Sequence, residues 1–209
     1  MEDVIGRHAG LVIPSPEGTG VLKPLGMDGN FVARLASARI GGTFNQYAGS
    51  VLRQERLRLY LEARADAKVV LVGEAAGYRG ARVSGLAFTS ERQLTGTGPA
   101  EASATIVHRV LARLGIEEDV LLWNAVPTHP GTESSNRAPR RDEVEAAAPF
   151  LEEILRGRVA VAVGRVAAAA TDAAYVRHPS YGGAAAFEAG LERAFATIRR
   201  RRAGVRRFL

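Results

Sequence analysis

From residue 47 onwards the chain alternates longer helical patterns with short apolar runs, and this alternation constrains its fold more than any other feature. The apolar runs have the length and valine content of buried strands. We predict strands at 68–72, 120–123, 159–163 and 175–176, and helices at 31–40, 47–65, 99–114, 141–155, 166–173 and 184–202. Strands that alternate with helices form parallel sheets covered by helices. The sequence therefore predicts a three-layer α/β/α fold around a central, mainly parallel four-stranded sheet.

The length of the chain suits a single domain. It has 209 residues and no visible internal repeat, enough to bury a full core. Residues 1–30 are rich in glycine and proline and are predicted to form an irregular arm, whereas residues 199–209 form a basic tail. Residues 73–99 carry little regular signal, so we expect a long loop, which in a compact domain is usually functional.

Composition excludes several kinds of chemistry. The chain has no cysteine, so disulfides, thiol catalysis and cysteine-bound zinc or iron–sulfur clusters are ruled out. The four histidines lack metal-binding spacing, and we expect neither a metal nor another cofactor; the alternative is magnesium held by carboxylates. No apolar run has membrane-spanning length and no signal-peptide pattern occurs. We therefore expect a cytoplasmic protein that makes no membrane contact.

The charge of the chain points to an anionic partner. Its net charge is +6, and apart from Lys23 and Lys68 every basic residue is an arginine. The densest run, Arg199–Arg202, suits phosphate binding through the planar guanidinium. The same run also suits a solvated helix end, where cations interact favourably with the helix dipole. For the whole chain, the positive charge favours a polyanion such as nucleic acid.

Three strand ends carry polar residues. The run Val69–Val72 stops at Gly73, and Glu74 follows in a turn of small residues that lets a ligand approach the backbone. Asn124 follows a buried strand, where its amide offers the donor and acceptor that read a base edge. His178, held by the proline after it, is rigidly aimed and suited to donate to a developing anion. Because parallel strands place their carboxyl ends at one edge of a sheet, these side chains are expected to meet there.

Each of these residues also has a purely structural interpretation. Glu74 fits a plain strand-to-helix turn, Asn124 a turn that caps its strand, and His178 a bond to a nearby carbonyl. Phe88, an aromatic residue in a polar loop, either fills the core or stacks on a flat ligand.

Four segments in this order resemble the uracil-DNA glycosylase superfamily. They are the Gly-Glu-Ala-Ala-Gly turn at 73–77, Phe88 three residues after Gly85, the Trp-Asn-Ala-Val-Pro run at 123–127, and the His-Pro-Ser run at 178–180. The segment from Pro127 through Glu152 most resembles the branch whose members carry an iron–sulfur cluster. The resemblance spans about residues 68–195 and implies a four-stranded parallel sheet between helices, as predicted above.

The resemblance also implies a function and a set of roles. Members of the family excise uracil from DNA by flipping the nucleotide into a pocket, so the implied partners are uracil-containing DNA and released uracil. Phe88 would stack on the base and Asn124 would read its pyrimidine edge. His178 would stabilise the anionic uracil oxygen, and Glu74 would orient or polarise water. We expect the protein to act as a monomer.

Other positions would complete the pocket and the DNA interface. Ala75 would line the uracil site, and Tyr78 would form a wall against the methyl group of thymine. Arg79, Arg82 and Arg137 lie in the motif loops and are expected to contact phosphates. Ser180 would contact DNA, and Tyr181 or Phe187 would fill the gap left by the flipped base.

The sequence departs from the family pattern in several places. The cluster cysteines are missing, so packing must order the loops that a cluster orders in relatives. Ala76 stands where most relatives have proline, and Ala75 where some branches have a catalytic aspartate or asparagine. Acidic residues that often follow the first motif are replaced by Tyr78, Arg79 and Gly80. His129 lies in the loop that carries a covalent histidine in the uracil-crosslinking branch.

The two lysines limit the chemistry. Strand cleavage after base removal usually needs an amine that forms a Schiff base, and neither Lys23 nor Lys68 belongs to a motif loop. We therefore predict a monofunctional glycosylase that leaves an abasic site. Two rival hypotheses stay open: a protein that binds deaminated bases without excising them, and an unrelated nucleotide or phosphosugar enzyme. The Gly73–Gly80 turn argues against the latter, because it has neither a P-loop lysine nor dinucleotide-binding spacing.

Overall fold

The computed structural model describes residues 30–205, with side chains up to Arg201. Its strands are β1 (Val69–Ala75), β2 (Val120–Val126), β3 (Val159–Val163) and β4 (Ala174–Val176). Its helices are α1 (Phe31–Ser37), α2 (Val51–Ala63), α3 (Ala81–Ser84), α4 (Glu91–Thr95), α5 (Ala102–Leu114), α6 (Arg141–Leu155), α7 (Arg165–Thr171) and α8 (Ala184–Val205). Most of the predicted arm, the end of the tail and Lys23 lie outside the described residues.

The four strands form one sheet in the order β2-β1-β3-β4, and every pair is parallel. The register pairs Gly73 with Asn124 and Ala75 with Val126 across β1 and β2. All four strands therefore end at the same edge of the sheet, as the sequence predicted. This carboxyl edge is where open α/β folds place their ligands.

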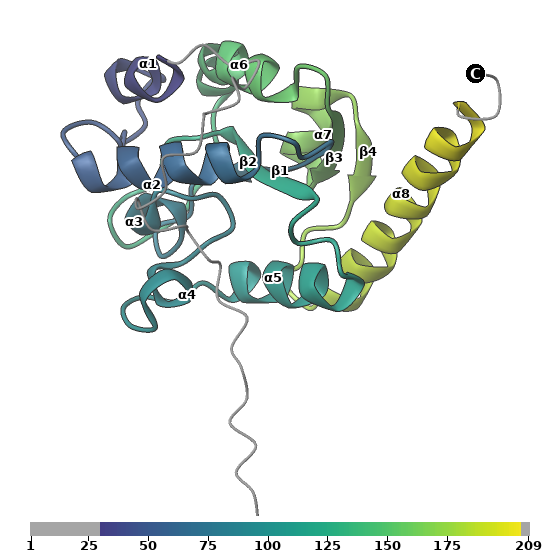
Figure 1. The fold of residues 1–209 in the computed structure, drawn as a ribbon. Coiled ribbons are helices and arrows are strands. Elements are labelled where there is room, and N and C mark those ends of the chain that lie inside the picture. Colours follow the sequence, from purple (N-terminus) through teal and green to yellow (C-terminus); the bar gives the residue numbers. More distant parts are fainter. Residues whose placement is uncertain (1–29, 206–209) are drawn as a thin grey trace, which may run out of the picture.

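Helices cover both faces of the sheet (Figure 1). Helix α6 lies in the connection from β2 to β3 and α7 in the connection from β3 to β4, and both contact the strands. Helix α5 lies in the connection from β1 to β2, which runs in the opposite direction across the sheet, and it contacts α8. Because connections between parallel strands are right-handed, the two opposite directions place α6 and α7 on one face of the sheet and α5 on the other. β1 and β2 are buried along almost their whole length, and Trp123 packs against Phe31 of α1. The predicted three-layer α/β/α architecture is confirmed.

Several predicted boundaries were wrong. The strand predicted at 68–72 runs to Ala75 and the one at 120–123 runs to Val126, because Ala75 and Val126 still pair with each other. Glu74, Ala75 and Asn124 thus belong to the strands rather than to the loops after them. The loop predicted at 73–99 contains two short helices, α3 and α4.

The helix predicted at 47–65 starts only at Val51, where the Ser50 side chain accepts a hydrogen bond from Arg53 N–H as an N-cap. The helix at 141–155 and the strand at 159–163 were predicted with their observed bounds. Among residues 30–205, no helix combines the length and the apolar character needed to cross a bilayer.

Candidate active site

Two glycines at the ends of the central strands leave space for the predicted site residues. A Cβ atom at Gly73, in β1, would lie 2.5 Å from Phe88 Cζ and 2.6 Å from Asn124 Oδ1. A Cβ atom at Gly164, after β3, would lie 3.8 Å from His178 Cβ. Phe88 and Asn124 therefore meet directly above Gly73, and His178 lies above the neighbouring strand β3. The structure brings these three side chains to one edge of the sheet.

Phe88 adopts a strained backbone conformation. Its φ angle is +52°, which bulky residues rarely adopt and which costs about 1–3 kcal/mol. Its ring is buried against Gly73. Asn124 is also buried, and in the described part of the chain its side-chain amide has no hydrogen-bond partner. A flat aromatic face beside an unpaired amide can hold a planar ligand that itself donates and accepts hydrogen bonds.

The tautomer of His178 follows from its neighbour Ser180. The Ser180 N–H donates to His178 Nδ1 at 3.2 Å, and the Ser180 hydroxyl lies 2.8 Å from the same nitrogen. Because a backbone N–H can only donate, Nδ1 accepts, and the hydrogen of the neutral ring sits on Nε2. Burial lowers the pKa of His178 and thereby favours the neutral ring. Ser180, predicted to bind DNA, thus orients His178 in this structure.

Glu74 is a half-buried carboxyl group at the end of β1, with Ala75 next to it. Burial raises its pKa above the ordinary value. A carboxyl group with restricted access to water and a raised pKa is suited to proton exchange with a nearby water molecule. Its place in the strand fixes its backbone, because Gly73 and Ala75 on either side are paired with β2.

Tyr78 and Arg79 lie in the turn that follows β1. The Tyr78 N–H donates to Asn136 Oδ1 at 2.9 Å, which ties this turn to the loop after β2. The Arg79 guanidinium lies 5.3 Å from the centre of the Tyr78 ring and is exposed. This pair therefore presents a cation at the rim, next to a half-buried ring.

Tyr181 is the most exposed large side chain near the site, with 98% of its surface accessible. Its φ angle is +51°, so it is strained like Phe88. The alternative candidate for the same role, Phe187, was a wrong prediction: it is completely buried on the first turns of α8. Of the two residues, only Tyr181 is exposed.

Two of the arginines predicted to bind phosphate are already paired. Arg137 donates two hydrogen bonds, of 2.8 and 2.5 Å, to the buried carboxylate of Glu143. Arg82 pairs with Glu133 at 3.0 Å and stacks on the Phe44 ring at 4.9 Å. Both arginines thus hold the loop after β2 in place.

Direct contacts hold the loop after β2. The chain has no cysteine, so its residues do not fit an iron–sulfur cluster. Thr43 and Thr128 share a hydrogen bond of 2.6 Å, and Gln46 Nε2 donates to the Pro127 carbonyl at 2.8 Å. The backbones of Phe44 and His129 exchange two hydrogen bonds, of 2.8 and 2.9 Å. Hydroxyl, amide and backbone contacts therefore order this segment. Among the described residues, no group of three or more His, Asp or Glu side chains is arranged to bind a metal.

His129 belongs to this support and is not exposed to a ligand. It is fully buried, and its two ring nitrogens lie 2.6 Å from the Ala76 carbonyl and 2.7 Å from the Thr132 carbonyl. Both nitrogens are engaged, so neither is free to form a bond with a ligand.

Sequence reasoning missed one half-buried carboxyl group beside the turn after β1, that of Glu101. Its carboxylate packs against Gly77 and Gly80, in the space that side chains at those positions would occupy, and burial raises its pKa. It lies against the turn in which this chain lacks the acidic residues that the resemblance led us to expect. No local sequence signal marks it, because Glu101 lies more than twenty residues away, just before α5.

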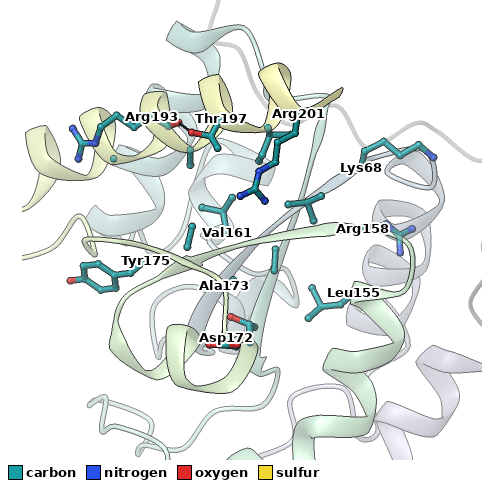
Figure 2. Close-up of a pocket in the computed structure, with 17 residues that line it drawn as sticks. Lys68, Leu155, Arg158, Val161, Asp172, Ala173, Tyr175, Arg193, Thr197 and Arg201 are labelled. Carbon is teal, nitrogen blue, oxygen red and sulfur yellow. Dashed lines mark hydrogen bonds between the residues drawn. The ribbon is translucent and has the colours of Figure 1, made fainter. Parts of the chain in front are cut away.

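A separate groove of about 1360 Å³ lies at the opposite edge of the sheet. Its walls are one face of α8 and the first residues of β3 and β4, as Figure 2 shows with Arg193, Thr197, Val161 and Tyr175. Lys68, just before β1, also lines it. The groove contains none of the predicted site residues.

Comparisons with known proteins agree with the fold. Residues 61–199 match the model of the family described as the uracil DNA glycosylase superfamily. The crystal structure of wild-type SMUG2 from Pedobacter heparinus is similar in fold, with a TM-score of 0.59, 10% sequence identity, and coverage of 81% of this chain and 98% of that one. No curated protein matches the chain in sequence. Since the family match covers well over half of its length, the chain belongs to the uracil DNA glycosylase superfamily.

Proposed function

We propose that the protein hydrolyses the N-glycosidic bond of uracil in DNA and leaves an abasic site. The observation that carries this proposal is the meeting of Phe88 and Asn124 above Gly73, with His178 over the neighbouring strand. The Phe88 ring offers a stacking face, and the Asn124 amide pairs with the N3–H and a carbonyl oxygen of uracil. Tyr78 at the rim excludes the methyl group of thymine.

The bond breaks as the base leaves with negative charge and the sugar becomes cationic. His178 is a neutral donor through Nε2 and stabilises the developing oxyanion of uracil; a donor of this kind contributes a factor of about 10²–10³ in rate. Glu74, once ionised, balances the positive charge of the sugar and orients the water that attacks it. Because Ala75 supplies no second polar group, Glu74 carries the handling of water at this edge.

The DNA around the base is held from the rim. Arg79 contacts a phosphate, and Tyr181 enters the stack in place of the flipped nucleotide. Lys68 lines the groove at the opposite edge of the sheet (Figure 2), away from the proposed site. Its position supports a monofunctional enzyme, since a Schiff base needs an amine at the sugar.

A second candidate function is binding of deaminated bases without excision. It is favoured by Ala75 and by the single carboxyl group that β1 presents at the site. The two functions differ in one measurable property, the release of base.

The experiment uses oligonucleotides that contain uracil, hypoxanthine, xanthine or a thymine mismatch, followed by treatment with and without alkali. We expect breaks at uracil after alkali alone, with Glu74→Gln, Asn124→Ala and His178→Ala each slower than wild type. Retention of the oligonucleotide without any alkali-labile site supports binding alone. If wild type and all three variants release uracil at the same rate, the assigned site is wrong.

A further inference from the structure

Phe88 is held in its strained conformation by hydrogen bonds on both sides. The Thr89 hydroxyl donates to the Ala87 carbonyl at 3.0 Å, and the Ser84 hydroxyl donates to the Thr89 carbonyl at 2.6 Å. Thr89 and Ser84 are both fully buried, so water does not compete for these bonds. The carbonyl groups that flank Phe88 are therefore fixed, and with them the direction of its ring over Gly73.

A histidine outside the motif loops completes this support. His108, on α5, places Nε2 3.2 Å from the Thr89 hydroxyl and Nδ1 2.8 Å from the Glu117 carboxylate. The direction of the contact between the Thr89 hydroxyl and His108 Nε2 depends on the tautomer of the ring, and in either direction the contact ties Thr89 to α5. The Glu117 carboxylate in turn orients the ring through Nδ1, as carboxylates orient histidines at many functional sites.

We propose that His108, oriented by Glu117 and acting through Thr89, is a positioning residue for the base-stacking face of Phe88. The proposal rests on the function proposed above. None of the three residues touches the substrate; they keep Phe88 in a conformation that its own backbone disfavours. Without them Phe88 relaxes, its ring leaves the face of the base, and the base fits less well beside Asn124.

The sharpest test compares two variants at position 89. Thr89→Val keeps the shape and removes the hydroxyl, whereas Thr89→Ser keeps the hydroxyl. We expect Thr89→Val to weaken the binding of free uracil and to lower kcat/KM for uracil in DNA about fivefold to tenfold, the factor of about one hydrogen bond. Thr89→Ser should restore most of the wild-type value. His108→Leu should behave like Thr89→Val.

A double-mutant cycle separates positioning from general stability. In a Phe88→Ala background, Thr89→Val should cause no further loss of kcat/KM, because there is no ring left to position. A merely structural role predicts the same further loss in both backgrounds. Equal losses, or wild-type activity in Thr89→Val, overturn the proposal.

One readout does not depend on catalysis. In protein with labelled phenylalanine rings, the Phe88 resonances are assigned by their disappearance in Phe88→Ala. They should shift in Thr89→Val and His108→Leu but stay close to wild type in Thr89→Ser. If wild type releases no base from any substrate, the proposed function fails while these shifts still support the positioning network. Unshifted resonances in all variants reject the network, whatever the activity.

Discussion

The ring of Phe88 covers the backbone of Gly73 so closely that a Cβ atom at position 73 would lie 2.5 Å from Phe88 Cζ. Such a contact cannot be accommodated without movement. Gly73→Ala should therefore displace Phe88 or Asn124 and lower the rate of uracil excision by about 10²-fold, the effect of a misplacement of about 1 Å. Single-turnover excision measures this loss.

A matched glycine provides the control. A Cβ atom at Gly42 would meet its nearest neighbour, Glu143 Oε1, at 3.8 Å, an ordinary contact. Gly42→Ala should leave excision unchanged. Equal activity of Gly73→Ala and wild type would show that Phe88 and Asn124 do not need their observed positions.

Glu74 should make excision and stability respond to pH in opposite directions. Burial raises its pKa, and the ionised form is the one that balances the sugar cation. The acidic limb of the rate should therefore lie above the ordinary glutamate pKa of about 4.3, with activity rising as the pH rises through it. Glu74→Gln should abolish this limb and lower the plateau.

The stability effect of Glu74 has the other sign. A carboxyl group whose pKa is raised in the folded state favours folding below its unfolded pKa and loses that contribution as the pH rises through the folded value. Glu74→Gln should therefore unfold at a higher temperature than wild type at pH 8 and at the same temperature at pH 4. A variant that is less stable than wild type at pH 8 would contradict this account.

Ser180 should affect the rate through His178. Both its N–H and its hydroxyl face Nδ1, so Ser180→Ala removes one of two contacts that orient the ring. We expect the rate of excision to fall about tenfold, as when a residue that orients a functional histidine is removed. The affinity for DNA should change little. Ser180→Thr, which keeps the hydroxyl, is the control. If Ser180→Ala weakens DNA binding and leaves the rate of bound complexes unchanged, Ser180 contacts DNA instead.

The architecture was predictable because local signals and tertiary contacts agree in most elements. The helix Arg141–Leu155 follows helical periodicity, and its predicted bounds were correct. The short helices α3 and α4 were missed, because four or five residues give no periodicity to detect and depend on tertiary contacts. The carboxyl ends of β1 and β2 were missed because pairing with the neighbouring strand, not composition, decides where a strand ends.

The candidate site was predictable only to the level of residue types. Glu74, Asn124 and His178 stand out as polar residues at strand ends. The space above Gly73, the Ser180–His178 contact and the place of Glu101 depend on segments brought together by folding. Arg137 shows the same limit: its sequence context suggested phosphate, whereas folding gives it a buried carboxylate.

Tyr181 should matter for double-stranded DNA more than for single-stranded DNA. It is almost fully exposed and has a φ angle of +51°. Tyr181→Gly relieves this strain and should raise the free energy of unfolding by about 1 kcal/mol. Without a side chain to fill the stack, excision from duplex DNA should fall about tenfold, the order of one lost stacking contact, and excision from single strands should stay unchanged.

Tyr175 is a matched control for Tyr181. It is also an exposed tyrosine, but it lies at the opposite edge of the sheet. Tyr175→Gly should leave the ratio of duplex to single-strand activity unchanged. If both substitutions lower excision from duplex DNA by the same factor, the loss in Tyr181→Gly does not come from insertion of Tyr181 into the base stack.

The pair between Arg137 and Glu143 should make stability depend on acid pH. Arg137 and the Arg140 N–H lower the pKa of Glu143 to about 2. A carboxyl group with a lowered pKa stabilises the fold above its unfolded pKa of about 4.3, and this contribution is lost as the pH falls towards 2. Arg137→Gln should lower the free energy of unfolding by about 1–3 kcal/mol at pH 7, because it leaves a buried carboxylate poorly compensated.

Denaturant titrations at pH 7 and pH 2.5 measure both effects. The difference between wild type and Arg137→Gln should be largest at pH 7 and should shrink at pH 2.5, where Glu143 begins to be protonated. Arg141 is the control, since its pair with Glu145 is exposed and contributes little; Arg141→Gln should change stability by less than about 0.5 kcal/mol. A loss for Arg137→Gln that is the same at both pH values would mean that Arg137 stabilises the loop by packing rather than by its charge.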